Sequence, residues 1–178
     1  MTVPPRPAAA MTEPPRPAAA MTEPPRPAAA MSVPPIQGIS HLALSAADLP
    51  AALAFWTTVM GFEVTTDEPG LAFVVHREAR IGIAVTDHGG AVAGGFDELR
   101  PGLDHLAFAV ADAVALEAWQ ARLAAYDVTH SPIADSGSGL HLNLRAPGGL
   151  PIELYVMSPD TAAAFGLATT SEAYAVTY

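Results

Sequence analysis

The chain repeats one segment of itself. Residues 38–65 (GISHLALSAADLPAALAFWTTVMGFEVT) align without a gap on residues 102–129 (GLDHLAFAVADAVALEAWQARLAAYDVT), 64 positions later, and ten of the 28 aligned residues are identical. The identical positions include His41 and His105. A repeat of this length indicates two copies of one supersecondary unit. The 178 residues are enough for both copies to share a core in a single domain.

Each copy predicts the same order of elements, βαβββ. Each begins with large apolar residues that alternate with small or polar ones, which is typical of a half-buried strand. Asp48 or Asp112 follows as a helix N-cap, and an apolar stripe at helical spacing comes next. Gly61 is expected to end the first helix. Turn residues then separate three further strands, expected at 62–67, 71–77 and 80–87 in the first copy and at 127–133, 139–145 and 151–157 in the second.

The predicted domain, residues 36–157, is flanked by segments of different character. Residues 1–35 hold three near-identical Pro- and Ala-rich decamers, the start of a fourth, and eleven of the 18 prolines. Because proline fixes φ and lacks an amide donor, this stretch is predicted to be a disordered tail, and translation from Met31 would omit most of it. Within the domain we expect module one at 38–88, a Gly-rich connector at 89–101 and module two at 102–157. Residues 158–178 form a weakly patterned tail.

The composition excludes several classes of function. The chain has no cysteine, so disulfides, thiolate catalysis and iron–sulfur clusters are excluded. All eight basic residues are arginines, which excludes a Schiff-base lysine or a phosphate-loop lysine. A formal net charge of −10 argues against nucleic acid and against an anionic membrane. These features favour a cytoplasmic protein whose partner is a small-molecule substrate.

The period-2 alternation divides the predicted sheet into two faces. One face carries branched and aromatic residues that should pack on the helices. The other carries Ala and Gly together with a few His, Glu and Arg side chains, which suits the inside of a ligand cup better than a solvated face. The fold class is therefore α+β: two βαβββ modules form a curved mixed sheet, with the helices outside.

Three side chains on the small-residue face are candidate metal ligands. The duplication puts His41 and His105 at matching points of the two first strands, and Glu153 lies on the last strand, on the same face. Two neutral imidazoles and one carboxylate bind a divalent metal and leave positions open for substrate or oxygen. A carboxylate between Ile152 and Leu154 on a strand needs a partner, which strengthens the prediction.

The same face offers further polar groups. Asn143 and Arg145 are candidate substrate-binding residues, while Tyr155 and His141 are candidates for supplying a proton or a hydrogen bond. All four also fit the polar rim of a sheet, and this alternative stays open. The remaining histidines, His76, His88 and His130, have no assigned partner and are expected at the surface.

These residues carry a resemblance to a known family. GISHLAL with DLPAALAFWTTVMGFEV, then GLDHLAFAVAD and GLPIELYV, resemble the vicinal oxygen chelate superfamily over residues 36–157. The group includes glyoxalase I, extradiol dioxygenases, fosfomycin-resistance enzymes and bleomycin-resistance proteins. The resemblance maps the family's metal positions onto His41, His105 and Glu153. Gly82 stands where many members have a fourth ligand, so the pattern resembles the three-ligand members.

The resemblance implies a homodimer and leaves three functions open. The first is a metal-dependent dioxygenase, lyase or isomerase that holds Fe(II), Mn(II), Ni(II) or Zn(II) and acts on a substrate with vicinal oxygens. The second is a metal-free protein that sequesters a drug, as bleomycin-resistance proteins do. The third is a structural or regulatory domain with a decayed site. Members of the superfamily complete the cup either within one chain or by exchange between two chains, and the sequence does not choose between them.

Overall fold

A computed structural model describes residues 33–36 and 38–167. The chain divides into two units, Met1–Gln37 and Gly38–Tyr178. In the first unit, residues 33–36 form neither helix nor strand, and Val33 and Ile36 are exposed. The decamer repeats, predicted to be disordered, lie outside the described residues, as does the end of the C-terminal tail.

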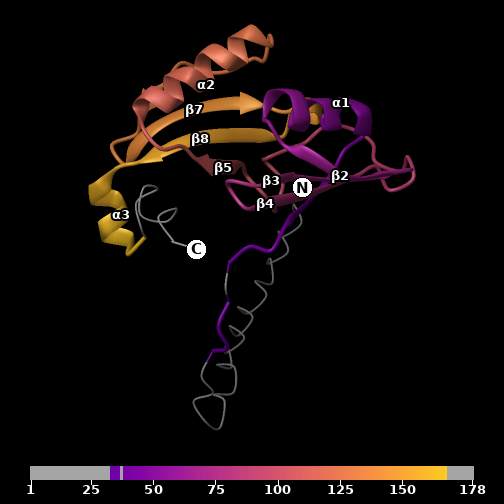
Figure 1. Cartoon of the computed structure of the whole chain (residues 1–178), viewed down its shortest axis with the longest axis horizontal. Helices are drawn as coiled ribbons and strands as arrows, with labels where there is room; N and C mark the ends of the chain where they lie inside the picture. The colour runs from indigo at the N-terminus through magenta and orange to yellow at the C-terminus, as the bar shows by residue number, and fades with distance from the viewer. Residues whose placement is uncertain (1–32, 37, 168–178) are drawn as a thin grey trace, which may run out of the picture. The chain divides into compact units, whose positions relative to one another are not determined.

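The second unit contains the two predicted modules (Figure 1). Module one consists of β1 (Leu42–Ser45), α1 (Leu49–Ala54), a π-helical turn (Phe55–Val59), β2 (Glu63–Glu68), β3 (Leu71–His76) and β4 (Ile81–Thr86). Module two consists of β5 (Leu106–Ala109), α2 (Ala113–Ala125), β6 (Ala134–Asp135), β7 (Gly139–Arg145), a 3-10 turn (Pro147–Gly149) and β8 (Pro151–Met157). A short helix that the sequence did not predict, α3 (Pro159–Phe165), follows β8.

Aspartate caps begin both long helices, as predicted. The Asp48 carboxylate accepts a hydrogen bond from the Ala51 amide at 2.9 Å, and the Asp112 carboxylate accepts one from the Ala115 amide at 2.8 Å. Each bond satisfies an amide that has no partner within the helix. The first helix continues through the π-helical turn and ends before Gly61, whose φ of 79° few other residues adopt.

The strands form two four-stranded mixed sheets. Their orders are β1-β4-β3-β2 and β5-β8-β7-β6, so both modules have the same topology. In each module the first strand pairs in parallel with the last, and the remaining pairs are antiparallel. The predicted α+β fold of two βαβββ modules is confirmed.

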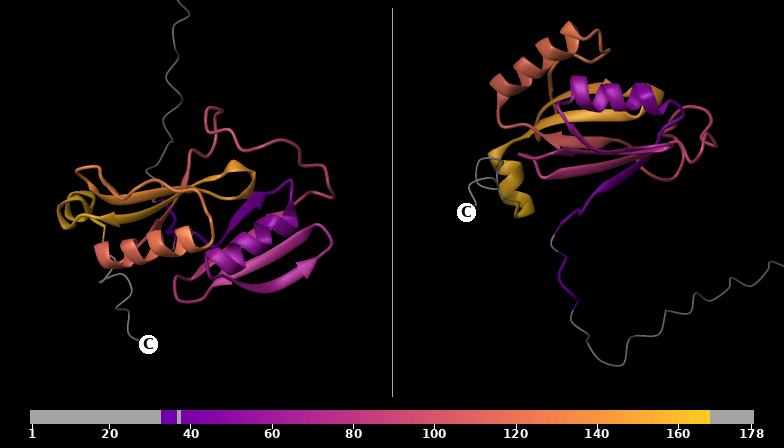
Figure 2. Two further views of the ribbon diagram at one scale, coloured as in Figure 1. Left: turned by 90° about the horizontal axis from the view of Figure 1, so that it is seen from above. Right: turned by 45° about the vertical axis from the view of Figure 1, so that its right-hand side comes forward.

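The two modules share one core beneath the helices. Helices α1 and α2 lie above the strands in Figure 1, and the left view of Figure 2 shows the modules side by side. A single apolar cluster joins Trp56 and Ile83 of module one to Leu116 and Leu154 of module two, all less than 3% exposed. Apart from Val74, the strand residues in this cluster are those that the alternation assigned to the core face.

The prediction of a strand at 127–133 is wrong. The structure has only the two-residue strand β6, at Ala134–Asp135, with one isolated bridge between His130 and Leu144. The intervening chain still follows β7, because the Ser131 amide donates to the Asn143 carbonyl at 2.8 Å. Pro132 has no amide to donate, so the ladder is interrupted there and resumes at Ala134, which pairs with His141.

No helix in the described ranges is long and apolar enough to cross a membrane.

Candidate functional site

The face of the sheets opposite the helices is open. Along β1 and β5 the core-side residues are half-buried, whereas Ala43, Ser45, Ala107 and Ala109 are exposed. The predicted polar residues lie on this open face in a fixed register. Glu153 pairs with Ala107 on one side and Asn143 on the other, and Tyr155 pairs with Ala109 and His141. The open face therefore combines small side chains with a row of polar ones.

Two of the three predicted ligands meet on this face. The His105 Nε2 atom lies 3.5 Å from the Glu153 Oε2 atom. The side chain of His105 is 44% exposed and that of Glu153 is 19% exposed, so the pair faces outward. The Asp104 carboxylate holds the other ring nitrogen of His105, Nδ1, at 2.6 Å. This bond fixes the ring so that Nε2 is directed toward Glu153.

His41, the third predicted ligand, lies apart from this pair. Its Nδ1 is bonded to the Ser40 hydroxyl at 2.8 Å, and its ring lies beside Phe73, with 6.2 Å between the ring centroids. Within residues 33–36 and 38–167, no three His, Asp or Glu side chains of one chain gather closely enough to hold a metal ion. One chain thus presents a two-ligand pair and a separate single histidine.

The residue before each duplicated histidine has a role that sequence reasoning missed. Ser40 and Asp104 occupy equivalent positions of the repeat, and both hydrogen-bond Nδ1 of the histidine that follows. A partner on Nδ1 leaves Nε2 as the ligating nitrogen, which is the usual arrangement of metal-binding histidines. The donor set therefore fits a divalent metal. The sequence signal was a hydrogen-bonding residue before each copy of the repeated histidine.

Phe73 covers Gly82 on β4, the residue onto which the resemblance maps a fourth metal ligand. A Cβ added to Gly82 would lie 2.9 Å from Cζ of Phe73 and 3.7 Å from Cβ of His41. The phenyl ring thus rests on the glycine, next to the histidine. A carboxylate side chain at position 82 would collide with this ring.

The candidate proton donors differ in their surroundings. Nδ1 of His141 is buried and has no hydrogen-bond partner among the described residues. The ring of Tyr155 extends over Gly139, because a Cβ at that glycine would lie 3.0 Å from the tyrosine hydroxyl. Gly139 is four positions along β7 from Asn143, the residue paired with Glu153. The tyrosine hydroxyl is therefore directed away from the His105–Glu153 pair.

Arg145, a predicted substrate-binding residue, is already engaged. Its guanidinium donates to the Glu98 carboxylate at 2.5 Å and to the Gly149 carbonyl at 2.9 Å. The bond from Arg145 lowers the pKa of Glu98 to about 2, and the carboxylate raises the pKa of the guanidinium. Sequence reasoning missed Glu98, which lies in the connector and has no pattern that points to Arg145.

The other histidines are only partly at the surface. His88 is exposed, as predicted, and bonds to the Ser45 hydroxyl at 3.1 Å. His76 and His130 are half-buried instead. The Phe62 ring packs against His76 with 5.4 Å between the ring centroids, and this contact covers part of the His76 side chain.

Comparison with known proteins agrees with the fold. The model of the Glyoxalase/Bleomycin resistance protein/Dioxygenase superfamily matches residues 38–154, most of the chain. The chain belongs to this superfamily. A search of curated proteins found no match.

Solved structures of the superfamily share the fold. A glyoxylase/bleomycin resistance protein/dioxygenase domain from Frankia sp. EAN1pec is 24% identical, with a TM-score of 0.59, and the match covers 74% of this chain and 99% of that one. Lactoylglutathione lyase from Agrobacterium tumefaciens is 25% identical, with a TM-score of 0.56 and coverage of 68% and 95%. An antibiotic-binding protein, TnmS3 from Streptomyces sp. CB03234, is 22% identical, with a TM-score of 0.54 and coverage of 69% and 98%.

Proposed function

We propose that the open face is half of a metal-dependent active site for a small substrate with two adjacent oxygen atoms, and that a second copy of the chain supplies the other half. His105 and Glu153 of one copy and His41 of the other hold the metal. The observation that carries the proposal is the outward-facing pair of His105 Nε2 and Glu153 Oε2, 3.5 Å apart, with no third ligand close by in the described part of its own chain.

The donor set supports a resident divalent metal. Two imidazoles and a carboxylate suit Fe(II), Mn(II), Ni(II) or Zn(II). A metal bound there supplies Lewis-acid chemistry to an oxygen substituent of the substrate. The Phe73 ring over Gly82 keeps a fourth protein ligand out, which leaves room for two substrate oxygens.

The chain's own residues orient the substrate and handle the proton. Asn143 lies beside Glu153 and offers an amide donor and acceptor to a substrate oxygen. Nδ1 of His141 is buried and closed to a substrate, so proton transfer by this residue would use its other ring nitrogen, Nε2. We assign the proton transfer to His141. Tyr155 contacts the substrate toward Gly139, and Arg145 positions the connector rather than the substrate.

Metal binding by the full-length protein tests the site. The protein is purified without chelator, loaded separately with each of the four metals and analysed for bound metal. We expect about one ion per chain, and at least a tenfold loss of affinity in each of His41→Ala, His105→Ala and Glu153→Ala. His130→Ala, a half-buried histidine outside the site, is the matched control. Undiminished binding in the three variants contradicts the proposal.

Mixing two inactive variants tests whether the site spans two copies. A dimer of one His41→Ala chain and one Glu153→Ala chain has one site with all three ligands and one site that lacks two. Random assortment makes about half of the co-refolded dimers mixed, so the preparation should regain about a quarter of the metal bound by dimers of the wild type. If both sites lie within single chains, the mixture binds no more than either variant alone.

A metal-free binding protein is the second candidate. The contact between His105 and Glu153 forms without a metal, and Phe73 with the small residues of the open face suits an apolar ligand. One structural neighbour is an antibiotic-binding protein. Under this candidate, an aromatic drug binds equally well to the chelator-treated protein, to the metal-loaded protein and to His105→Ala.

A further inference from the structure

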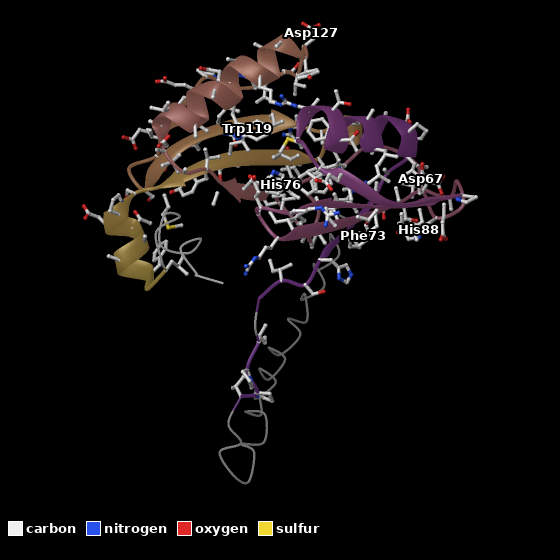
Figure 3. The ribbon with its side chains drawn as sticks, in the orientation of Figure 1. Asp67, Phe73, His76, His88, Trp119 and Asp127 are labelled. Atoms are coloured by element: carbon white, nitrogen blue, oxygen red, sulfur yellow. The ribbon has the colours of Figure 1, made fainter. Side chains whose placement is uncertain are left out.

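A second hollow lies between the modules, on the helix side of the sheets. Its volume is about 230 Å³. The residues that line it come from the end of the first helix, the β3–β4 turn, β5, α2 and β8: Met60, Phe62, His76, Ala79, Ile81, Phe108, Ala109, Val110, Ala111, Ala115, Trp119 and Leu154. Figure 3 shows Trp119 under α2 and His76 below it. Leu154 lies between Glu153 and Tyr155 on β8, so the hollow and the open face are on opposite sides of the same strand.

We propose that this cavity binds a small, neutral aromatic molecule that carries one hydrogen-bond acceptor, and that it does so without a metal. The size fits such a ligand, because a cavity of about 150 Å³ with apolar walls holds benzene. Pockets for drug-sized ligands have volumes of roughly 300–1,000 Å³, so this cavity is too small for them. The hollow arises from small side chains, since four of the twelve residues around it are alanines.

The walls of the cavity are suited to an aromatic ring. The rings of Phe62 and Phe108 stand nearly perpendicular to each other, with centroids 6.3 Å apart and an interplanar angle of 69°. Trp119 adds a third aromatic surface. Such edges and faces favour a planar ring over an aliphatic chain of equal size. No Asp or Glu lines the cavity, so a cation would lose its hydration without gaining a counter-ion.

His76 supplies the polar contact. The backbone amide of Ala79 donates to its Nδ1 at 3.2 Å, so the neutral ring carries its proton on Nε2. Among the described residues, no protein acceptor bonds to this Nε2–H. His76 is the one ionisable residue among the twelve that line the cavity. An acceptor on the ligand, such as a ketone oxygen, would complete it.

Acetophenone and ethylbenzene form a matched pair of probes, because they share a ring and a similar shape but only the ketone has an acceptor. The full-length protein is titrated with each, and the two tryptophan indole resonances are followed by NMR. Trp56 is buried away from the cavity lining, whereas Trp119 forms part of it. We expect the Trp119 resonance to move with half-saturation at about 1 mM or below, and acetophenone to bind about fivefold tighter than ethylbenzene.

Three variants locate the binding. Ala115→Met fills the cavity from α2, and Ala111→Leu fills it from the preceding loop, so a folding defect in one leaves the other informative. Both should abolish the Trp119 shift, whereas Ala118→Met, at an exposed position of α2 outside the lining, should not. His76→Phe keeps an aromatic ring without the donor, so acetophenone should bind as weakly as ethylbenzene.

Three results overturn the proposal: no movement of the Trp119 resonance, unchanged binding in the folded filling variants, or an unchanged preference for acetophenone in His76→Phe. Benzylammonium that binds as tightly as acetophenone also contradicts the proposal, because no carboxylate lines the cavity to pair with a cation. Metal loading plays no part in this experiment, so its outcome is independent of the site at His105 and Glu153.

Discussion

At the scale of single residues, the two repeated histidines have hydrogen-bond partners of different strength. Asp104 offers a carboxylate to His105, whereas Ser40 offers a hydroxyl to His41. A carboxylate on Nδ1 both orients the ring and makes it a more basic ligand. The proposed metal site should therefore depend more on Asp104 than on Ser40.

We expect Asp104→Ala to weaken metal binding by about 10–100-fold, because the His105 ring loses the partner that holds it. Ser40→Ala should cost less, since a neutral hydroxyl forms the weaker bond. Calorimetric titration with Mn(II) measures both. Asp97→Ala, another exposed aspartate that makes an ion pair, with Arg100, is the control. Equal affinities for Asp104→Ala and the wild type would rule out this role.

The contact between Gly82 and Phe73 predicts a non-additive pair of substitutions. Gly82→Ala places a methyl group 2.9 Å from the phenyl ring, so the ring must move, at a cost of about 1 kcal/mol of unfolding free energy. In a chain that also carries Phe73→Leu, the methyl group has room and the cost should disappear. Urea unfolding of the four proteins in the cycle measures the coupling. Strictly additive costs would contradict the contact.

Local regularities in the sequence, the repeat and the strand alternation, led to His41, His105 and Glu153 as candidate ligands. Of these, the structure brings His105 and Glu153 within 3.5 Å of each other and leaves His41 apart. Glu98 and the phenyl ring over Gly82 were missed because both contacts join residues from different elements. No period in the sequence relates such pairs, and only the folded chain brings them together.

At the scale of elements, hydrogen bonds hold the connector, residues 89–101, against the turn between β7 and β8. The Phe96 amide donates to the Gly148 carbonyl at 2.7 Å, and Glu98 pairs with Arg145. Because the pKa of Glu98 in the folded state lies below its ordinary value of 4.5, the pair stabilises the fold fully above pH 4.5. Its contribution is lost as the pH falls through about 2.

An NMR titration of the Glu98 carboxyl carbon should therefore give a pKa of about 2 in the wild-type protein. In Arg145→Met the pKa should return toward 4.5, because the hydrogen bond that stabilises the carboxylate is lost. Arg77→Met, which removes a different exposed ion pair with Glu63, leaves Glu98 unchanged. A Glu98 pKa near 4.5 in the wild-type protein would contradict the hydrogen bond between Glu98 and Arg145.

Local patterns predicted most of the elements. The caps at Asp48 and Asp112 and the strands at 139–145 and 151–157 follow from side-chain chemistry within a few residues. The expected strand at 127–133 failed because Pro132 interrupts a ladder that apolar content alone favoured. Helix α3 was not predicted because its seven residues show little apolar periodicity. Ala162 is its one buried residue, so a single position carries its packing on the rest of the chain.

At the scale of the whole molecule, one hydrogen-bonded arginine joins the modules above their shared core. Arg122 on α2 donates from Nε to the Val59 carbonyl at 2.7 Å and from Nη2 to the Thr58 carbonyl at 2.6 Å. These carbonyls lie in the last turn of the first helix, where the helix has no amides left to donate. The guanidinium also lies over the Tyr126 ring, 5.0 Å from its centroid, which holds it in place.

Arg122→Met should lower the unfolding free energy by roughly 1.5–3 kcal/mol, because it removes charged donors from carbonyls at a helix C-terminus. Arg100→Met, whose arginine makes only a local exposed pair with Asp97, should cost less than about 0.5 kcal/mol. Both variants should still unfold in a single transition, since Trp56 and Leu116 belong to one core and neither module has a core of its own. Fluorescence and circular dichroism during urea unfolding measure this directly. Two separate transitions in Arg122→Met would mean that the arginine, and not the core, makes the modules fold together.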